Sequence, residues 1–253
     1  PILGAGILLA FPAKRFRHLQ SFAAIGVLVV VLAAAIALLI GSLDGPVVLD
    51  MGGWAAPVGI SLVADRLSTL MLVTSVTVTL VVLIYSMFQG VADGDKGAPS
   101  AIYFPAFLIL SAGVSNAFLS GDLFNIYVGF EILLASSFVL ITMGGTSERM
   151  RTGSVYVIVS LVSSMLFLIA IATVYAATGA LNLAQLAQRL DDLPDSTALL
   201  IQLLLLTTFS IKAAVFPLSF WLPDSYPTAP APVTAVFAGL LTKVGVYAIL
   251  RTQ

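Results

Sequence analysis

The chain is poor in charged and metal-binding side chains. It contains no cysteine and one histidine, His18, which excludes disulfides, thiol chemistry and any metal or haem site built from Cys or His ligands. Asp, Glu, Lys and Arg together make up only 9% of the 253 residues, whereas soluble domains carry about a quarter. The formal net charge of −1 provides no basic face for nucleic acid. We therefore expect no cofactor, no bound metal and no nucleic-acid partner.

Hydrophobic residues dominate instead, at 60% of the chain, and the mean hydropathy is +1.10. A protein with so few polar groups needs lipid as the solvent for most of its surface. Continuous apolar runs of about 20 residues cross a bilayer as helices, because a helix satisfies its own backbone hydrogen bonds. We predict an all-α, polytopic membrane protein with about eight transmembrane helices. The predicted spans lie within 2–11, 19–43, 67–92, 97–121, 123–147, 154–177, 196–223 and 225–250.

Basic residues in the connections predict the orientation. More of them fall in the connections 12–19, 91–102 and 144–153 than on the opposite side, so we place these three connections in the cytoplasm. On one side lie Lys14, Arg15, Arg17, Lys96, Arg149 and Arg151; on the other lie Arg66, Arg189 and Arg251. The connection 42–66 is expected to form a hairpin over the outer surface, with Trp54 at the interface. The amphipathic stretch 180–193 is expected to lie along the interface.

Three charges fall inside predicted spans: Glu131, Lys212 and Lys243. A charge near the bilayer centre costs about 3 kcal/mol on insertion scales, so each is a candidate for ion transport. The alternative is a structural Glu–Lys pair that only holds helices together. Two lysines compete for one carboxylate, which favours a site that loads and releases a proton. We therefore predict these three residues as the proton-translocation site.

A helix break is predicted beside Lys212. Pro217 removes one backbone hydrogen bond and clashes with the carbonyl of Ala213. Prolines continue at 223, 227, 230 and 232, which forbids a regular helix across the region. Transporters place ion sites at such breaks, because irregular backbone at membrane depth is tolerated where it lines a wet cavity. The alternative is an ordinary proline-rich loop.

Hydroxyl groups near these charges form a possible relay. Thr208 lies one turn before Lys212, Tyr127 lies one turn before Glu131, and Ser163 belongs to a serine stripe with Ser160 and Ser164. The alternative for each Ser and Thr is a bond to its own helix backbone. Two carboxylates, Asp122 and Asp224, are expected to cap helices, and Gly239 and Gly245 are expected to allow close helix approach near Lys243.

These residues carry a family resemblance. The segments 121–145 (GDLFNIYVGFEILLASSFVLITMGG) and 209–251 (FSIKAAVFPLSFWLPDSYPTAPAPVTAVFAGLLTKVGVYAILR) resemble the antiporter-like family. That family comprises the Mrp-type cation/proton antiporter subunits and the proton-pumping membrane subunits of respiratory complex I. The outer segment 53–68 is also similar to the family. The ending LLTKVGVYAILR after SYPTAPAPV is most similar to the D-type branch of the Mrp antiporter subunits.

The resemblance implies a pseudo-symmetric bundle of two inverted halves, with Glu131 and Lys212 as the family's Glu–Lys pair and Lys243 as the onward lysine. Pro1 is not an initiator methionine, so we interpret the chain as cut from a longer protein, and the resemblance implies that it is the first half. Residues 1–120 would hold N-terminal helices and the outer loop, and 121–253 the start of the proton-translocating core.

The resemblance further implies a transporter subunit rather than an enzyme, working with other subunits in a bacterial plasma membrane on protons and Na⁺ or K⁺. The alternative is a proton-pumping subunit of an NADH:quinone oxidoreductase or a membrane-bound hydrogenase.

Overall fold

The computed structural model describes residues 1–10, 13–89 and 100–253. The predicted loop 91–102, with Lys96, falls largely outside the described residues, as do the side chains of Lys14, Arg15 and Arg17. The described elements are the helices α1 Ile2–Ala10, α2 Ala13–Gly41, α3 Arg66–Phe88, α5 Ser100–Leu119, α6 Leu123–Thr142, α7 Ser147–Thr178, α8 Leu183–Arg189, α9 Asp195–Ala213, α10 Leu222–Thr228, α11 Ala231–Val236 and α12 Thr242–Thr252, the strands β1 Val47–Asp50 and β2 Ser61–Ala64, a 3-10 turn η1 Met51–Gly53 and a π-turn η2 Phe237–Leu241.

Seven helices among the described residues are long and apolar enough to cross a membrane, which confirms the all-α polytopic prediction. Continuous helix runs from α11 through η2 into α12, so these three elements form one of the seven. The eighth predicted span corresponds to α1, whose nine residues are too few to cross alone. α7 has 32 residues, so it begins earlier than the predicted span 154–177. At about 48 Å it is longer than the roughly 30 Å hydrocarbon core.

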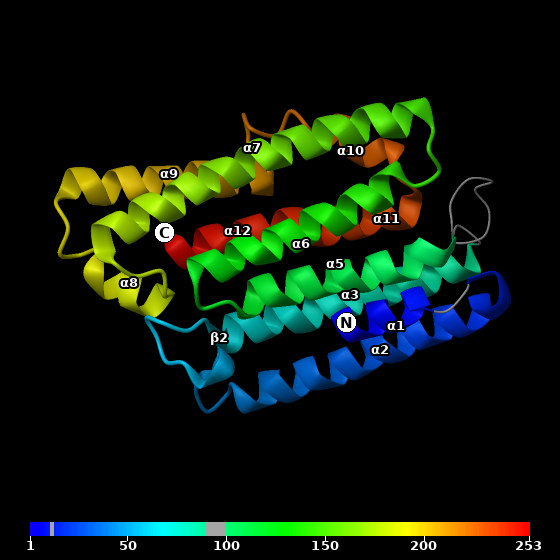
Figure 1. Cartoon of the computed structure of the whole chain (residues 1–253), viewed down its shortest axis with the longest axis horizontal. Coiled ribbons are helices and arrows are strands. Elements are labelled where there is room, and N and C mark those ends of the chain that lie inside the picture. The colour runs from blue at the N-terminus through cyan, green and yellow to red at the C-terminus, as the bar shows by residue number, and fades with distance from the viewer. Residues whose placement is uncertain (11–12, 90–99) are drawn as a thin grey trace.

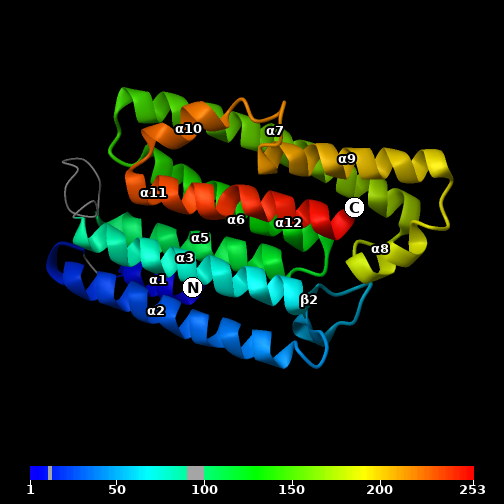
Figure 2. The same ribbon diagram turned by 180° about the vertical axis from the view of Figure 1, so that it is seen from behind.

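The long helices lie lengthwise beside one another in an elongated bundle (Figures 1 and 2). The β-hairpin and α8 lie at one end, and the α6–α7 turn and α10 lie at the other (Figure 1). α9 ends roughly halfway along the bundle. α5 packs closely on α6, and Gly129 permits this close approach. A Cβ added at Gly129 would lie 3.1 Å from the Ala117 backbone nitrogen.

The predicted hairpin is present, and the stretch predicted to lie along the interface contains a short helix. β1 pairs with β2 in antiparallel register, with Val47 opposite Ala64 and Asp50 opposite Ser61. Trp54, between the strands, is exposed. The stretch 180–193 contains α8, which is capped by Asn182 through bonds from the amides of Ala184 and Gln185.

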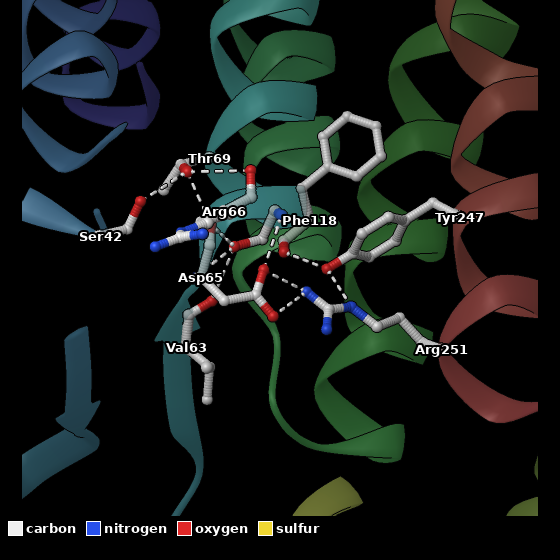
Figure 3. A network of polar contacts seen from close by, with 9 residues as sticks. Ser42, Val63, Asp65, Arg66, Thr69, Phe118, Tyr247 and Arg251 are labelled. Carbon is white, nitrogen blue, oxygen red and sulfur yellow. Dashed lines mark hydrogen bonds and ion pairs between the residues drawn. The ribbon is translucent and has the colours of Figure 1, made fainter. Parts of the chain in front are cut away.

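An ion pair connects the hairpin end of α3 to the end of α12 (Figure 3). Asp65 caps α3 by accepting from the Ser68 amide at 2.8 Å, and it pairs with the Arg251 guanidinium at 2.5 Å. Arg251 also donates to the Tyr247 hydroxyl at 2.8 Å, which in turn donates to the Phe118 carbonyl at 2.7 Å. This cluster therefore joins α3, α5 and α12.

The pair makes stability depend on pH. Burial tends to raise the pKa of Asp65, but hydrogen bonds from Arg251 and Ser68 outweigh burial and hold that pKa below its usual range. A carboxylate with a depressed pKa in the folded state stabilises above its unfolded pKa, and this contribution is lost as the pH falls. Asp65→Asn keeps a capping side chain, since Asn is as good an N-cap as Asp, but removes the charge.

We expect Asp65→Asn to lower the free energy of unfolding by about 1–3 kcal/mol at pH 7. The difference from wild type should shrink as the pH falls below about 4, because the carboxylate is protonated first in the unfolded chain and, at lower pH, in the folded one. Thermal unfolding of the purified complex in detergent, at pH 7 and at a pH below about 4, measures this difference between the variant and wild type. Asp44→Asn, at an exposed carboxylate near the same end of α3, is the control. A deficit that is equal at both pH values would contradict the ion-pair explanation.

Candidate functional site

Glu131 lies in the middle of α6, where a neighbouring helix supplies its partner. α6 starts at Asp122, whose carboxylate accepts from the amides of Phe124 and Asn125, so the predicted cap is confirmed. The Ser164 hydroxyl on α7 donates to Glu131 Oε1 at 2.5 Å. The carboxylate is therefore held against α7 rather than in lipid.

Lys212 lies in the last turn of α9 and reaches the same serine. Its Nζ donates to the Ser164 hydroxyl at 3.0 Å and to the Ser160 carbonyl at 3.2 Å. The ammonium nitrogen is also 5.4 Å from the centroid of the Phe130 ring on α6. The structure thus links Glu131 to Lys212 through Ser164, which accepts from the lysine and donates to the glutamate.

The predicted helix break beside Lys212 is confirmed. α9 ends at Ala213, and Ala214 adopts a left-handed conformation with φ of 54°. The Val215 amide bonds back to the Ser210 carbonyl at 2.9 Å, and the indole Nε1 of Trp221 donates to the Ile211 carbonyl at 3.2 Å. These bonds satisfy carbonyls that the broken helix leaves free.

One prediction in this region is wrong. Asp224 does not cap a helix: it lies in the first turn of α10, whose N-cap position is Trp221. Pro223 occupies the first turn of α10, where proline is favoured. The helix therefore starts before Asp224 rather than after it.

Lys243 takes a different environment from Lys212. It follows the π-turn, and its Nζ donates to the Ala238 carbonyl at 2.5 Å and the Thr242 hydroxyl at 3.3 Å. Its side chain is exposed on the surface of this chain. The helices of the two lysines nevertheless touch, because Gly245 packs on Ala213: an added Cβ would come within 2.6 Å of the Ala213 nitrogen. The prediction of close approach is confirmed there and at Gly239, which faces Val78.

Two of the predicted relay hydroxyls, those of Thr208 and Ser163, bond backbone carbonyls rather than the Glu131–Ser164–Lys212 bridge. Thr208 donates to the Leu204 carbonyl of its own helix, and Ser163 donates to the Thr208 carbonyl at 3.1 Å, which ties α7 to α9. The Tyr127 ring packs near Phe124 and Phe167. The serine that bridges the two charges is Ser164. It belonged to the predicted stripe, but spacing alone did not show which serine faces both charges.

A family model described as "NADH:quinone oxidoreductase/Mrp antiporter, TM" matches residues 120–253. Among curated relatives, the D subunit of the Na⁺/H⁺ antiporter from Alkalihalophilus pseudofirmus is 40% identical over 93% of this chain and 47% of its own length. The D subunit of the Bacillus subtilis Na⁺/H⁺ antiporter is 42% identical over 99% of this chain and 50% of its own length.

Two solved structures share the fold. A chain of the Mrp complex from Dietzia sp. is 36% identical, with a TM-score of 0.89 over 100% of this chain and 46% of that one. A chain of the membrane-bound sulfane sulfur reductase, an archaeal respiratory membrane complex, is 26% identical, with a TM-score of 0.89 over 98% of this chain and 50% of that one.

This chain spans about half the length of the curated relatives it matches. The match of the family model covers more than half of the chain and contains Glu131, Lys212 and Lys243. The resemblance seen in the sequence is confirmed: the chain belongs to the NADH:quinone oxidoreductase/Mrp antiporter family of transmembrane proteins.

Proposed function

We propose that this chain is the proton-translocating part of a D-type subunit in a multi-subunit Na⁺ or K⁺/H⁺ antiporter of a bacterial plasma membrane. The observation that carries this proposal is the Glu131–Ser164–Lys212 bridge beside the broken end of α9. Residues 121–253 contain the three charges predicted inside spans, Glu131, Lys212 and Lys243, so we assign translocation to that part and a supporting role to residues 1–120. The partners are other antiporter subunits.

The bridge can pass protons along its hydrogen bonds without a Na⁺ or K⁺ ion passing through it. If the Lys212 ammonium passes a proton to the Ser164 oxygen while the Ser164 proton passes to Glu131, the charged pair becomes a neutral pair. The reverse shift restores both charges. In both states the serine hydroxyl can donate one hydrogen bond and accept the other. Coupling to transport requires one state to be loaded from one side and unloaded toward Lys243.

Lys243 supports an onward step. An ammonium in the middle of a span needs polar cover, since exposure to lipid is costly. Two partners on its own helix, the Ala238 carbonyl and the Thr242 hydroxyl, satisfy part of its donor capacity. The remaining side is open on this chain's surface. We assign to it the outgoing proton, received from Lys212 across the closely packed α9 and α12.

A pump in a redox complex is the second candidate, favoured by the TM-score of 0.89 to a chain of a respiratory membrane complex. Antiport and redox pumping differ in what drives them. In vesicles holding the whole complex, an antiporter dissipates a pH gradient when Na⁺ or K⁺ is added. A redox pump responds to an electron donor and ignores the cation.

The bridge is tested by comparing two neighbouring serines in those vesicles. Ser164→Ala removes the hydroxyl that bonds both charges, so we expect the cation-driven proton flux to fall at least about ten-fold. Ser163→Ala is the matched control, because Ser163 is equally buried on the same helix but bonds a backbone carbonyl. It should retain most of the flux. Wild-type flux in Ser164→Ala would refute the bridge as the route.

A further inference from the structure

α7 carries a polar residue at every fourth position from its first turn to the bridge. Residues four apart are neighbours on a helix surface and form a continuous ridge. The exposure falls along this ridge, from an exposed first residue to three buried ones. The ridge consists of Glu148, Thr152, Tyr156, Ser160 and Ser164. Its last two members are those that contact Lys212.

The ridge begins in a hollow at the end of the bundle where α10 meets α7. The hollow has a volume of about 360 Å³, and its lining includes Glu148 and Thr152 from α7 and Asp224 and Thr228 from α10. The hydroxyls of Thr152 and Thr228 bond each other at 2.9 Å. The hollow is open to solvent, and its charged lining residues are the carboxylates Glu148 and Asp224 and the guanidinium of Arg151.

A second, much smaller cavity lies at the other side of Tyr156. Its volume is about 30 Å³, and its lining includes Tyr156, Ser160, Lys212 and Trp221. A site of this size holds one water molecule when two or more polar groups are present. Lys212 has three N–H donors, of which Ser164 and Ser160 take two. The third is available to a water in this cavity.

Tyr156 lies one helical turn beyond Thr152, which lines the hollow, and itself lines the cavity. Its ring is buried, with its centroid 5.7 Å from that of Trp221 and 6.4 Å from that of Phe237. Its hydroxyl bonds the Ser137 hydroxyl at 2.7 Å. Packed aromatic rings block a hydrated cation, whereas a hydroxyl can accept one proton and donate another.

We propose that Tyr156 is the proton-transfer residue that connects the α7–α10 hollow to Lys212, a role that rests on the proposed function. The Tyr156 oxygen accepts a proton from a hydronium ion that enters from the hollow side, which becomes water, as the tyrosine's own proton passes to the cavity water. That water in turn gives a proton to the neutral Lys212 amine, which becomes an ammonium. Tyr156 ends as it began, and one positive charge has moved from the hollow to the lysine.

The test uses Tyr156→Phe in vesicles that hold the whole complex. The substitution keeps the ring and its packing and removes only the hydroxyl. We expect the maximal cation-driven proton flux to fall at least about ten-fold, while the cation concentration for half-maximal flux stays unchanged. The flux is normalised to the amount of assembled complex, so a loss of assembled protein alone does not lower it. Tyr175→Phe, at an exposed tyrosine of the same helix, is the control and should transport normally.

A second variant covers the case in which Tyr156→Phe does not assemble. Val159 also lines the cavity, and Val159→Ile adds a methylene where the water would lie. It leaves every hydroxyl in place and should also slow the flux. Normal flux in Tyr156→Phe, or in Val159→Ile where the first variant fails to assemble, would overturn the role of Tyr156.

Vesicles with the wild-type complex and with Lys212→Ala are measured in the same experiment. They distinguish a failure of the proposed function from a failure of the proposed role of Tyr156. Absence of cation-driven flux in wild type, or normal flux in Lys212→Ala, would refute the proposed function itself. Flux that depends on Lys212 but not on the Tyr156 hydroxyl or the cavity would refute only the proposed role of Tyr156.

Discussion

Replacing Lys212 with alanine is expected to abolish cation-driven proton flux, by about 100-fold or more, while the protein remains in the membrane. The ammonium contacts Ser164 and also lines the adjacent cavity. Glu131→Ala should cause a similar loss, because it removes the acceptor of the Ser164 proton. The double variant should lose little more than either single variant, since the two residues act as one unit. Flux in vesicles, normalised to the amount of assembled complex, measures all three.

A structural Glu–Lys pair predicts a different pattern. Each single variant would then leave an unpaired charge and lower the unfolding temperature, but complexes that assemble would still transport. The double variant, which leaves no lone charge, would recover. Gln202→Ala controls for substitutions on α9, because Gln202 is exposed on that helix. Near-normal flux in assembled Lys212→Ala complexes would therefore establish the structural role and refute the translocation role.

Gly245→Ala is expected to destabilise the contact between the two lysine helices strongly. Its added Cβ would lie 2.6 Å from the Ala213 nitrogen and 2.9 Å from the Ala213 Cα, and backbone atoms cannot rotate away as a side chain does. Overpacking of this kind costs typically about 1–3 kcal/mol and sometimes more. α12 must move away from the end of α9, so we expect a lower unfolding temperature and a large loss of flux. Thermal unfolding and vesicle flux measure the two effects.

Gly26→Ala is the matched control for Gly245→Ala. Both glycines lie in transmembrane helices, but a Cβ added at Gly26 meets no atom within 4 Å. Alanine there should be neutral or slightly stabilising, because alanine favours the helix by about 1 kcal/mol. If Gly245→Ala proved as stable and as active as Gly26→Ala, the close packing of α12 on Ala213 would not matter for the site.

The two charges of the bridge could be predicted because their cost in lipid is visible in the sequence. Glu131 and Lys212 each interrupt an otherwise apolar run. Pro217 breaks or kinks any helix that contains it in its interior. The hairpin was predictable for a similar reason, since glycines and prolines punctuate residues 42–66. In each case one residue type imposes a local cost or backbone preference so large that tertiary packing does not override it.

The bridging serine could not be predicted, because Ser163 and Ser164 are adjacent and identical in chemistry. Which of them faces α6 depends on how α7 is rotated, and packing against α6 and α9 decides that. The pair of Asp65 and Arg251 was equally out of reach, since 186 positions separate the two residues. The predicted span 154–177 starts later than α7 because it was located by its apolar residues, whereas the first turns of α7 are charged and polar.

The π-turn before Lys243 changes how the last span must be numbered. A π-turn holds one residue more than an α-turn, so residues 231–236 and 242–252 do not share one helical wheel. Removing one residue from 237–241 would restore a regular helix that faces nearly as it does now, but winding the same five residues as an α-helix would rotate everything beyond them by about 100° relative to α11. Lys243 and Gly245 would then no longer face as they do while Pro232 stayed in place. The direction in which the lysine points is thus set by residue count as much as by residue identity.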